Sequence, residues 1–522
     1  MISSHPQLGR IATVKMAIQL AGVVMNPIAL LYVIPVLYVT GWTIYHLSHG
    51  FYNLFMHPLR DYPGPLISRA STLWYSRALS RGTIAQDLLA LHEKYGDTVR
   101  ITPDEISFID PQNWKQIYGY RASPAGKVEM IKDPRYHDTV KPTVTILTGN
   151  DAEHTYFRKV LSPPFSEISL KKNEWILHRF ATKFIARVKD VGDNGNKPVD
   201  IVDWFNYLTF DIIGYLAYGE DFNCLGESKL HEWIECSLAL ASLMTLGQSA
   251  RQLPYPFDEL YKWMFIPDSI HRRTKTHRDL VDQKVKARLG RDPEHMDFLQ
   301  KLVELRKDEK MDFGTLSEHA SLLTIGGSET TATLLSGAIY FLALNPEVYA
   351  KLTKEIRTTF AKEEDMTLLR LSQCAYLLGV VEETLRMYPP SPANHTRMVP
   401  EGGAVLEGKH IPGGLCVSMP MFASFNASSN WVEPRVFAPE RWTGENPDKY
   451  ARDRREALKP FSYGPRNCLG QQLANHEVRL ILGKIAWHFD LELMEESRGW
   501  EEQTSYTFWE KHRLWVKMKS VT

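Results

Sequence analysis

The sequence feature that most clearly predicts chemistry in this chain is a single cysteine in a short loop. Residues 461–470 read FSYGPRNCLG, so Cys468 lies between two glycines, Gly464 and Gly470, and two residues after Arg466. The thiolate form of cysteine is both the metal ligand and the nucleophile, and nearby cations favour it. The residues that follow, QQLANHEVRLILGKIAWHF, have helical periodicity. Cys468 is therefore expected just before a helix N-terminus, where the helix dipole favours an anion.

The glycines of this loop suggest how the sulfur is surrounded. Gly464 and Gly470 allow backbone angles that other residues resist, so they are expected to turn backbone N–H groups toward Cys468. The alternative is that Cys468 is a small buried hydrophobic residue, which is the usual state of a free cysteine.

A second candidate stretch, residues 321–344, reads SLLTIGGSETTATLLSGAIYFLAL. Its helical pattern contains Gly326 and Gly327, and each glycine costs a helix about 1 kcal/mol relative to alanine. Gly326 and Thr330 share a helix face, and Glu329 with Thr330 makes an acid–alcohol pair suited to proton delivery. The pattern predicts either a helix opened to admit a ligand or a helix crossing that needs small residues.

A third candidate is EETLR, residues 382–386. Glu383 and Arg386 are three residues apart on a predicted helix and can pair. If the pair is buried it needs further partners, because desolvation can exceed the Coulomb gain. Arg441, in FAPERW, is a candidate third member. The alternative is a solvated surface pair, which would contribute little.

Charge and cysteine content exclude several classes of protein. Lys+Arg and Asp+Glu both number 61 in 522 residues, so no bulk basic excess indicates a nucleic-acid partner. The five cysteines are widely spaced and form no CxxC pair. This pattern predicts neither a disulfide framework nor a structural zinc site, and it is typical of a reducing compartment.

The N-terminal segment predicts a membrane anchor. Residues 16–45 contain no Asp, Glu, Lys or Arg, and about 20 apolar residues suffice to span a bilayer. We assign residues 1–48 to the anchor, with a buried core helix as the alternative. Asn26-Pro27 leaves open a hairpin in place of a single span.

The rest of the chain is expected to form one globule. HPLRDYPGPL predicts a stiff proline-rich hinge over residues 49–66, since proline cannot continue a helix. Residues 67–522 show no dividing linker, and their pattern is mainly α with small β-sheets. One such piece, TVRITPDEISFID, predicts a short hairpin.

Four sequence elements together resemble the cytochrome P450 family. The family's loop signature, Phe-x-x-Gly-x-Arg-x-Cys-x-Gly, is matched at every fixed position by Phe461, Gly464, Arg466, Cys468 and Gly470. Its oxygen-activating helix motif, its Glu-x-x-Arg motif and its Pro-Glu-Arg element are matched at residues 326–330, 383–386 and 439–441. The four elements occur in family order, and the resemblance covers about residues 50–520.

The resemblance implies a fold that holds haem between two central helices. It implies that Cys468 is the metal ligand, binding the iron of heme b, and that thiolate ligation favours O–O cleavage. Glu329 and Thr330 would be the catalytic residues, relaying protons to bound O2. The buried Glu-x-x-Arg network would be structural. The resemblance also assigns cofactor-binding roles to Gly326, Phe461 and Gly470.

The two haem propionates need cations, and the resemblance indicates four candidate residues. His154 and Arg158, four residues apart in DAEHTYFRKVLSPPFS, match a family propionate-binding helix. Arg397 matches a second propionate-binding position, and Arg466 is the last candidate. A solvated role for His154 and Arg158 is the alternative.

The implied activity is a monooxygenase reaction. Segments such as FYNLFMHPLRDYPGPL are similar to fungal microsomal members. Many of these hydroxylate, epoxidise or desaturate lipophilic polyketide or terpenoid intermediates of secondary metabolism. NADPH electrons are expected from NADPH-cytochrome P450 reductase, with cytochrome b5 as an additional donor. A monomer is expected, held at the endoplasmic reticulum membrane by a single N-terminal anchor with its catalytic domain in the cytosol.

Two further interpretations concern the reductase and the reaction. The basic stretch DKYARDRREALKP, residues 448–460, predicts a docking surface for an acidic reductase, with a solvated face as the alternative. A haem-thiolate isomerase or dehydratase that needs no reductase, and a non-catalytic haem sensor, are the competing functions. The intact Glu329–Thr330 pair argues against both.

Overall fold

The structure is a computed structural model of the chain that describes residues 27–123, 126–135, 143–229, 232–291, 296–393 and 395–521. The chain divides into two compact units, residues 1–60 and 61–522. The predicted division into an anchor, a hinge and a catalytic domain stays a prediction.

The described part of the first unit is dominated by one helix, α2 (Pro27–Phe55). It contains no Asp, Glu, Lys or Arg, and large apolar side chains such as Tyr32, Leu37 and Leu47 are exposed. Within the described ranges, no helix meets the length and hydropathy that crossing a bilayer requires. Residues 1–26 of the predicted anchor lie outside those ranges.

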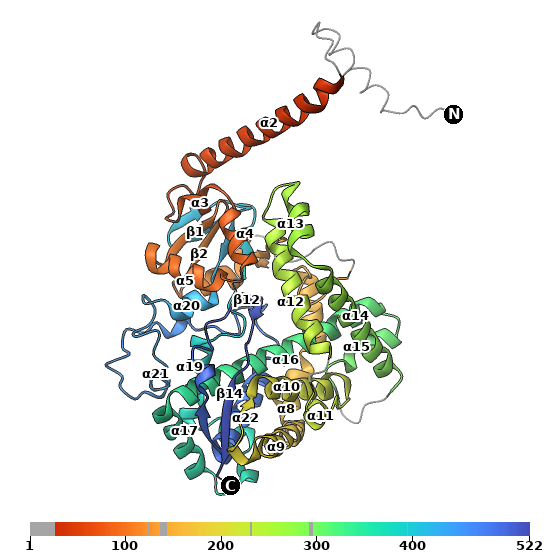
Figure 1. The fold of residues 1–522 in the computed structure, drawn as a ribbon, viewed down its shortest axis with the longest axis vertical. Coiled ribbons are helices and arrows are strands. Elements are labelled where there is room, and N and C mark those ends of the chain that lie inside the picture. Colours follow the sequence, from red (N-terminus) through yellow and green to blue (C-terminus); the bar gives the residue numbers. More distant parts are fainter. Residues whose placement is uncertain are drawn as a thin grey trace. The chain divides into compact units, whose positions relative to one another are not determined.

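The second unit is mainly helical, as predicted, and is organised around α16 (Phe313–Leu344). Residues 331–342 of this helix, TATLLSGAIYFL, are buried on every side. A helix that is apolar or small all round is stable only in the middle of a fold. It packs against α10 (Ile201–Tyr218), α19 (Ala375–Met387) and α22 (Gln471–His488), and Figure 1 shows α16 crossing the centre of this unit.

Shorter helices surround this centre. Before α16 they are α3 (Leu66–Ala70), α4 (Leu73–Ser80), α5 (Ile84–Tyr95), α6 (Asn113–Tyr118), α7 (Asp151–Leu161), α8 (Glu167–Lys172), α9 (Glu174–Val191), α11 (Cys224–Glu227), α12 (Glu232–Arg251), α13 (Phe257–Phe265), α14 (Asp268–Leu289) and α15 (Gln300–Lys307). After α16 they are α17 (Pro346–Thr359), α18 (Leu368–Leu371), α20 (Met421–Asn426) and α21 (Glu440–Thr443).

The largest sheet has the strand order β1-β2-β10-β7-β5. Its members are β1 (Thr98–Thr102), β2 (Glu105–Phe108), β10 (Cys416–Ser418), β7 (Arg397–Met398) and β5 (Ile131–Lys132). The predicted hairpin is confirmed, because β1 and β2 pair antiparallel with Val99 opposite Ser107. β5 pairs with β7 so that Lys132 lies opposite Arg397.

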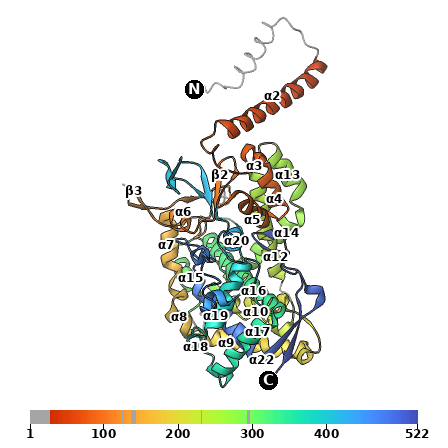
Figure 2. The ribbon, with the colours of Figure 1, turned by 90° about the vertical axis from the view of Figure 1, so that its left-hand side faces the viewer.

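The other sheets are small. β11 (Phe489–Leu493), β14 (Trp515–Ser520) and β6 (Val199–Asp200) form one of them. Two-stranded ribbons are formed by β3 (Arg121–Ser123) with β4 (Gly126–Val128), β8 (Ala404–Leu406) with β9 (Lys409–Ile411), and β12 (Ser505–Tyr506) with β13 (Phe508–Trp509). Figure 2 confirms that β2 and α3 lie at one end of this unit and α9, α17 and α22 at the other.

Candidate functional site

The loop before α22 has a conformation that only glycine allows at one position. Gly464 has φ +80°, and a Cβ there would approach the Tyr118 carbonyl oxygen to 2.0 Å. The loop closes when the Cys468 N–H donates to the Phe461 carbonyl over 2.9 Å. Gly470 has an ordinary φ of −87°, so no special backbone is needed there, but its N–H bonds to the Cys468 sulfur as expected. The unusual backbone of the loop lies earlier, at Ser462 with φ +62° and at Gly464.

The Cys468 sulfur has the expected position at the start of a helix. Cys468 lies three residues before Gln471, where the 18-residue α22 begins. Its side chain is exposed, whereas the other four cysteines are buried. The space that it faces lies inside the fold, so burial raises the pKa of the thiol, and the Gly470 N–H and the Arg158 charge act in the opposite direction. This arrangement suits a thiolate that is stabilised by a bound cation.

The two glycines of α16 have different functions. A Cβ at Gly327 would meet Ile213 of α10 at 2.5 Å, whereas a Cβ at Gly326 would have no atom within 4 Å. Gly327 thus permits a close helix crossing and Gly326 faces open space. The helix-crossing alternative is therefore correct for Gly327, whereas α16 is continuous at Gly326 and its opening to admit a ligand stays a prediction.

Glu329 and Thr330 point to different partners. The Thr330 hydroxyl donates to the Gly326 carbonyl over 2.7 Å, next to the open space. The Glu329 carboxylate is buried and accepts from Lys511 and, over 3.2 Å, from Thr333. The acid and the alcohol are adjacent in sequence, but each has its own hydrogen-bond partner in this structure.

Cations converge on one side of the cysteine loop. Lys132 and Arg397 are opposite each other across two strands, a pairing of like charges that is destabilising by itself. The pKa of Lys132 is well below its usual value, because of burial and then the charges of Arg397 and Arg466. The pKa of His154 is lowered to about 4 by burial, Arg466, Lys132 and Arg158 in that order. Such a cluster favours an anionic ligand.

The helix that carries His154 and Arg158 begins at a capping box. Asn150 accepts hydrogen bonds from the N–H groups of Ala152 and Glu153, and the Glu153 carboxylate accepts from the Asn150 N–H. This cap fixes the start of α7. Arg158 then reaches the cysteine loop, where it donates to the Asn467 carbonyl and, over 2.7 Å, to the Asn467 side chain.

Arg466 is held by protein groups in this structure. Its guanidinium donates to Glu129 over 2.6 Å, to the Gly149 carbonyl over 3.0 Å and to Asp151 over 2.9 Å. Its role toward a propionate stays a prediction, as do the roles predicted for His154, Arg158 and Arg397. Arg397 stacks over the Tyr118 ring, 4.9 Å from its centroid.

The predicted Glu-x-x-Arg network is buried and closed. Glu383 accepts from Arg386 over 2.8 and 2.9 Å and from Arg441 over 3.1 Å, and all three side chains are fully buried. Asp453 binds Arg441 over 2.8 Å and completes the network. The network joins α19 to the segment after α21, which leads into the cysteine loop. Its surface-pair alternative is wrong.

These features fit a haem. The chain supplies a thiol at a helix start, open space beside Gly326 and a cluster of cations that repel one another. An iron porphyrin with two propionates requires a soft ligand, open space and positive charge, and the chain supplies all three.

Sequence reasoning missed two residues of this region. Lys132 lies in the two-residue strand β5, which is too short to give a periodic signal. Lys511 lies in SYTFWEKHRLW, a stretch whose residues favour short strands. No local pattern identifies either lysine, because each acquires its role through a distant strand or helix.

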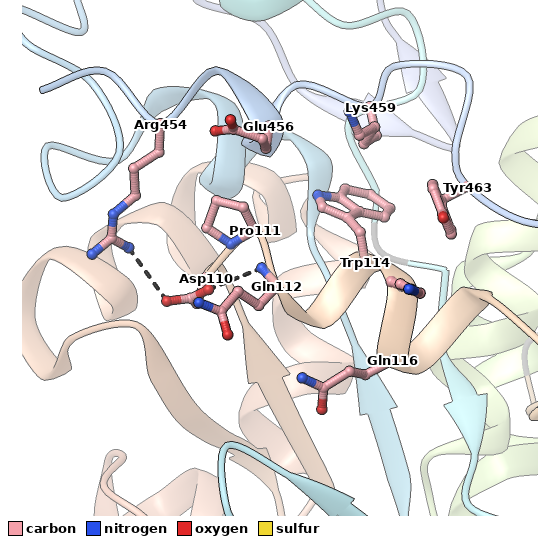
Figure 3. A pocket seen from close by; sticks show the side chains of 10 residues that line it. Asp110, Pro111, Gln112, Trp114, Gln116, Arg454, Glu456, Lys459 and Tyr463 are labelled. Atoms are coloured by element: carbon pink, nitrogen blue, oxygen red, sulfur yellow. Dashed lines mark hydrogen bonds and ion pairs between the residues drawn. The ribbon is translucent and has the colours of Figure 1, made fainter. Parts of the chain in front are cut away.

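A surface pocket of about 690 Å³ lies on the segment that leads to the cysteine loop. Figure 3 shows Trp114, Lys459 and Tyr463 on its wall, and Arg454 directed at Asp110. Arg454 pairs with Asp97 over 2.9 Å and with Asp110 over 3.6 Å, and Lys449 pairs with Glu433 over 2.8 Å. Part of the predicted basic surface is therefore neutralised within the protein.

Comparison with known proteins agrees with this arrangement. The chain matches the family model for cytochrome P450 over residues 62–511. Cytochrome P450 monooxygenase hepD of Aspergillus oryzae is 54% identical over 486 residues, which cover 93% of this chain and 95% of that protein. Cytochrome P450 monooxygenase astJ of the same species is 37% identical over 470 residues, which cover 90% and 93%.

A third relative is named for its reaction. Trichothecene C-15 hydroxylase of Fusarium sporotrichioides is 38% identical over 468 residues, which cover 89% of this chain and 93% of that protein. Similarity of this extent, together with the cysteine loop, the α16 motif and the Glu383 network, establishes that the chain belongs to the cytochrome P450 family.

Proposed function

We propose that the protein is a haem-thiolate monooxygenase that hydroxylates a lipophilic intermediate of fungal secondary metabolism. The observation that carries the proposal is the exposed thiol of Cys468 at the start of α22, in the same unit as a helix whose Gly326 faces open space. The hydroxylase among the relatives supports hydroxylation ahead of epoxidation or desaturation. A polyketide or a terpenoid is the proposed substrate class.

In this proposal the chain holds heme b through charge and one sulfur. Cys468 binds the iron, and Lys132, Arg397, His154 and Arg158 surround the two propionates. When bound, the haem supplies the centre at which O2 is activated. Arg158 donates hydrogen bonds to Asn467, so the residues proposed to surround the propionates are connected to the cysteine loop.

The chain's own residues are proposed to deliver protons. Thr330 presents a hydroxyl next to the open space, and Glu329 presents a buried carboxylate one residue before it. A positioned acid and alcohol of this kind are suited to deliver protons in defined steps. The same pair disfavours the alternative, an isomerase or dehydratase that uses no O2.

Electrons are proposed to come from NADPH through a separate cytochrome P450 reductase. Arg452, Arg455 and Lys459 lie in the stretch that leads to the cysteine loop. Of these, Lys459 lines the pocket in Figure 3. Complementary charge of this kind steers association between proteins.

The proposed location is the membrane of the endoplasmic reticulum. The uncharged stretch of residues 16–45 and the exposed apolar side chains of α2 support a single N-terminal anchor. The catalytic unit would then be in the cytosol.

The carbon monoxide difference spectrum of the reduced protein tests the haem ligand. Wild type is expected to absorb near 450 nm, the position typical of a thiolate ligand, and Cys468→Ala is expected to lose this band completely. A variant that keeps the band would contradict the assignment of Cys468.

Co-expression with a reductase and candidate intermediates, followed by mass spectrometry, tests the reaction. A product heavier than the substrate by one oxygen atom, formed only with NADPH, is expected. A product of unchanged mass that forms without NADPH would favour the isomerase alternative.

A further inference from the structure

A buried lysine from the C-terminal part of the chain contacts the acidic residue of the α16 motif. The Lys511 ammonium forms an ion pair with Glu329, and the two side chains are only 4% and 5% exposed. The same ammonium donates to the Thr333 hydroxyl over 2.8 Å. Removal of one partner from such a pair leaves an uncompensated buried charge, so the pair is expected to affect function strongly.

The segment around Lys511 is anchored on both sides. Two residues earlier, Trp509 donates to the Pro389 carbonyl over 2.8 Å and stacks on Tyr388. Three residues later, the Leu514 N–H donates to Asp200 over 3.1 Å, and Leu514 is fully buried. The lysine is therefore presented to α16 by a fixed backbone.

The contacts to Glu329 leave its carboxylate able to turn. Lys511 and Thr333 both bind the same oxygen, Oε1. A carboxylate held through one oxygen can rotate about that contact, whereas one held through both oxygens cannot. The Tyr388 hydroxyl, which faces the same region, instead donates to Gln503 over 2.7 Å.

We propose that Lys511 is a positioning residue for proton delivery. It holds the Glu329 carboxylate through Oε1, and a swing about Oε1 brings the second oxygen toward the open space beside Gly326. This inference rests on the proposed relay through Glu329 and Thr330. Lys511 acts only through Glu329 and touches neither substrate nor cofactor.

Hydroxylation consumes protons, and the relay through Glu329 and Thr330 must supply them. Hydroxylation follows R–H + O2 + NADPH + H⁺ → R–OH + H2O + NADP⁺, so two electrons come from NADPH and one oxygen atom leaves as water. The oxygen atom that leaves takes up two protons. In the proposal these protons pass from solvent to Glu329 and then to the Thr330 side.

The test compares Lys511→Met with wild type as full-length holoenzymes combined with a cytochrome P450 reductase. NADPH oxidation is measured in H2O and in D2O, with hydrogen peroxide release, and it needs no added substrate. Lys511→Met is expected to oxidise NADPH about tenfold more slowly and with a larger solvent isotope effect. Lys511→Arg keeps the charge and is expected to restore most of the rate.

Lys484→Met is the matched control, because Lys484 is 3% exposed and also pairs with a glutamate, Glu363, away from α16. It is expected to lower stability and leave the isotope effect unchanged. An unchanged isotope effect in Lys511→Met, or an equal rise in Lys484→Met, would overturn the proposal.

A second variant keeps the test decisive if Lys511→Met does not bind haem. Thr333→Val removes the hydroxyl that bridges the two charges at nearly constant volume, and it is expected to raise the isotope effect. An unchanged value in this variant overturns the inference. Wild type that forms no band near 450 nm or oxidises no NADPH would refute the proposed function itself, a distinct result.

Discussion

Two buried glutamates, Glu383 on α19 and Glu329 on α16, have very different surroundings. Glu383 accepts from Arg386, Arg441, the Trp442 indole and the Ala438 N–H, and both of its oxygens are bound. Burial raises the pKa of Glu383, but the two arginines and the other donors outweigh it and leave that pKa below its usual value.

Glu329 has fewer partners, and both bind one oxygen. Lys511 and Thr333 are its donors. The next residue, Thr330, donates to the carbonyl of Gly326, and Gly326 faces open space. A carboxylate held by four groups keeps a structure in place, whereas one held at a single atom can exchange partners. The difference between the two glutamates teaches that burial alone does not distinguish a structural acid from a reactive one.

The largest effect is expected from breaking the closed network. Glu383→Gln leaves Arg386 buried without its counter-ion, leaves Arg441 with Asp453 alone, and turns an amide N–H2 toward other donors. We expect a loss of about 3–5 kcal/mol of folding free energy, and little or no haem-containing protein. The yield of the 450 nm band per mass of protein measures this effect.

An exposed ion pair provides the control for that experiment. Glu433 pairs with Lys449 at 49% and 46% exposure, so Glu433→Gln is expected to leave stability nearly unchanged. Equal losses in the two variants would contradict the distinction between closed and exposed pairs.

The next largest effect is expected at the other glutamate, on turnover instead of folding. Glu329→Gln keeps the shape of the side chain but removes its ability to carry a proton. We expect roughly 100-fold slower NADPH-dependent turnover per molecule of enzyme that shows the 450 nm band. Single-turnover product formation or steady-state NADPH oxidation provides the measurement.

Glu477 on α22 is the matched control for this substitution. Burial raises the pKa of Glu477 to about 8, so it is mostly neutral at pH 7 and an amide resembles its native form. Glu477→Gln is expected to turn over like wild type. If Glu329→Gln did so as well, the contrast between Glu383 and Glu329 would be lost.

The smallest effect is expected at a third buried titratable residue, His92, whose hydrogen-bond partners are neutral. His92 is 2% exposed and bonds to Ser107 and the Gly96 carbonyl, and burial lowers its pKa to about 4. The unfolded chain binds this proton near pH 6.5 and the folded chain only near pH 4. Stability is therefore fully present above pH 6.5 and falls as the pH drops toward 4.

His92→Gln tests this linkage. Between pH 7.5 and pH 5, His92 is expected to account for about 2 kcal/mol of the stability lost by wild type. Urea unfolding of wild type and His92→Gln at the two pH values gives the difference. Parallel pH dependence in the two proteins would show that His92 does not titrate in this way.

Much of the site was predictable because its chemistry is local in sequence. Phe461 to Gly470 form one loop whose closing hydrogen bond spans seven residues, and Glu383 and Arg386 share one helix face. Arg441 was correctly predicted as their partner, whereas Asp453 was not, because the contact depends on how the segment after α21 folds back.

The contacts that escaped prediction join distant parts of the chain. Glu329 and Lys511 are 182 positions apart, and Lys132 meets Arg397 only through strand pairing. Periodicity reports which face of a helix is apolar, but it carries no information on which charged residue lies opposite.

The amino-acid sequence by itself determined the loop thiol just before a helix, the Glu-x-x-Arg pair and a mainly helical fold, since each depends on neighbours within a few turns. Only the tertiary structure decided that Gly327 serves packing and Gly326 faces open space. It also decided that Glu329 turns toward Lys511 and that Arg466 is held by two carboxylates. These outcomes depend on which elements pack together, because a side chain's partners are set by contacts that form only when the whole unit folds.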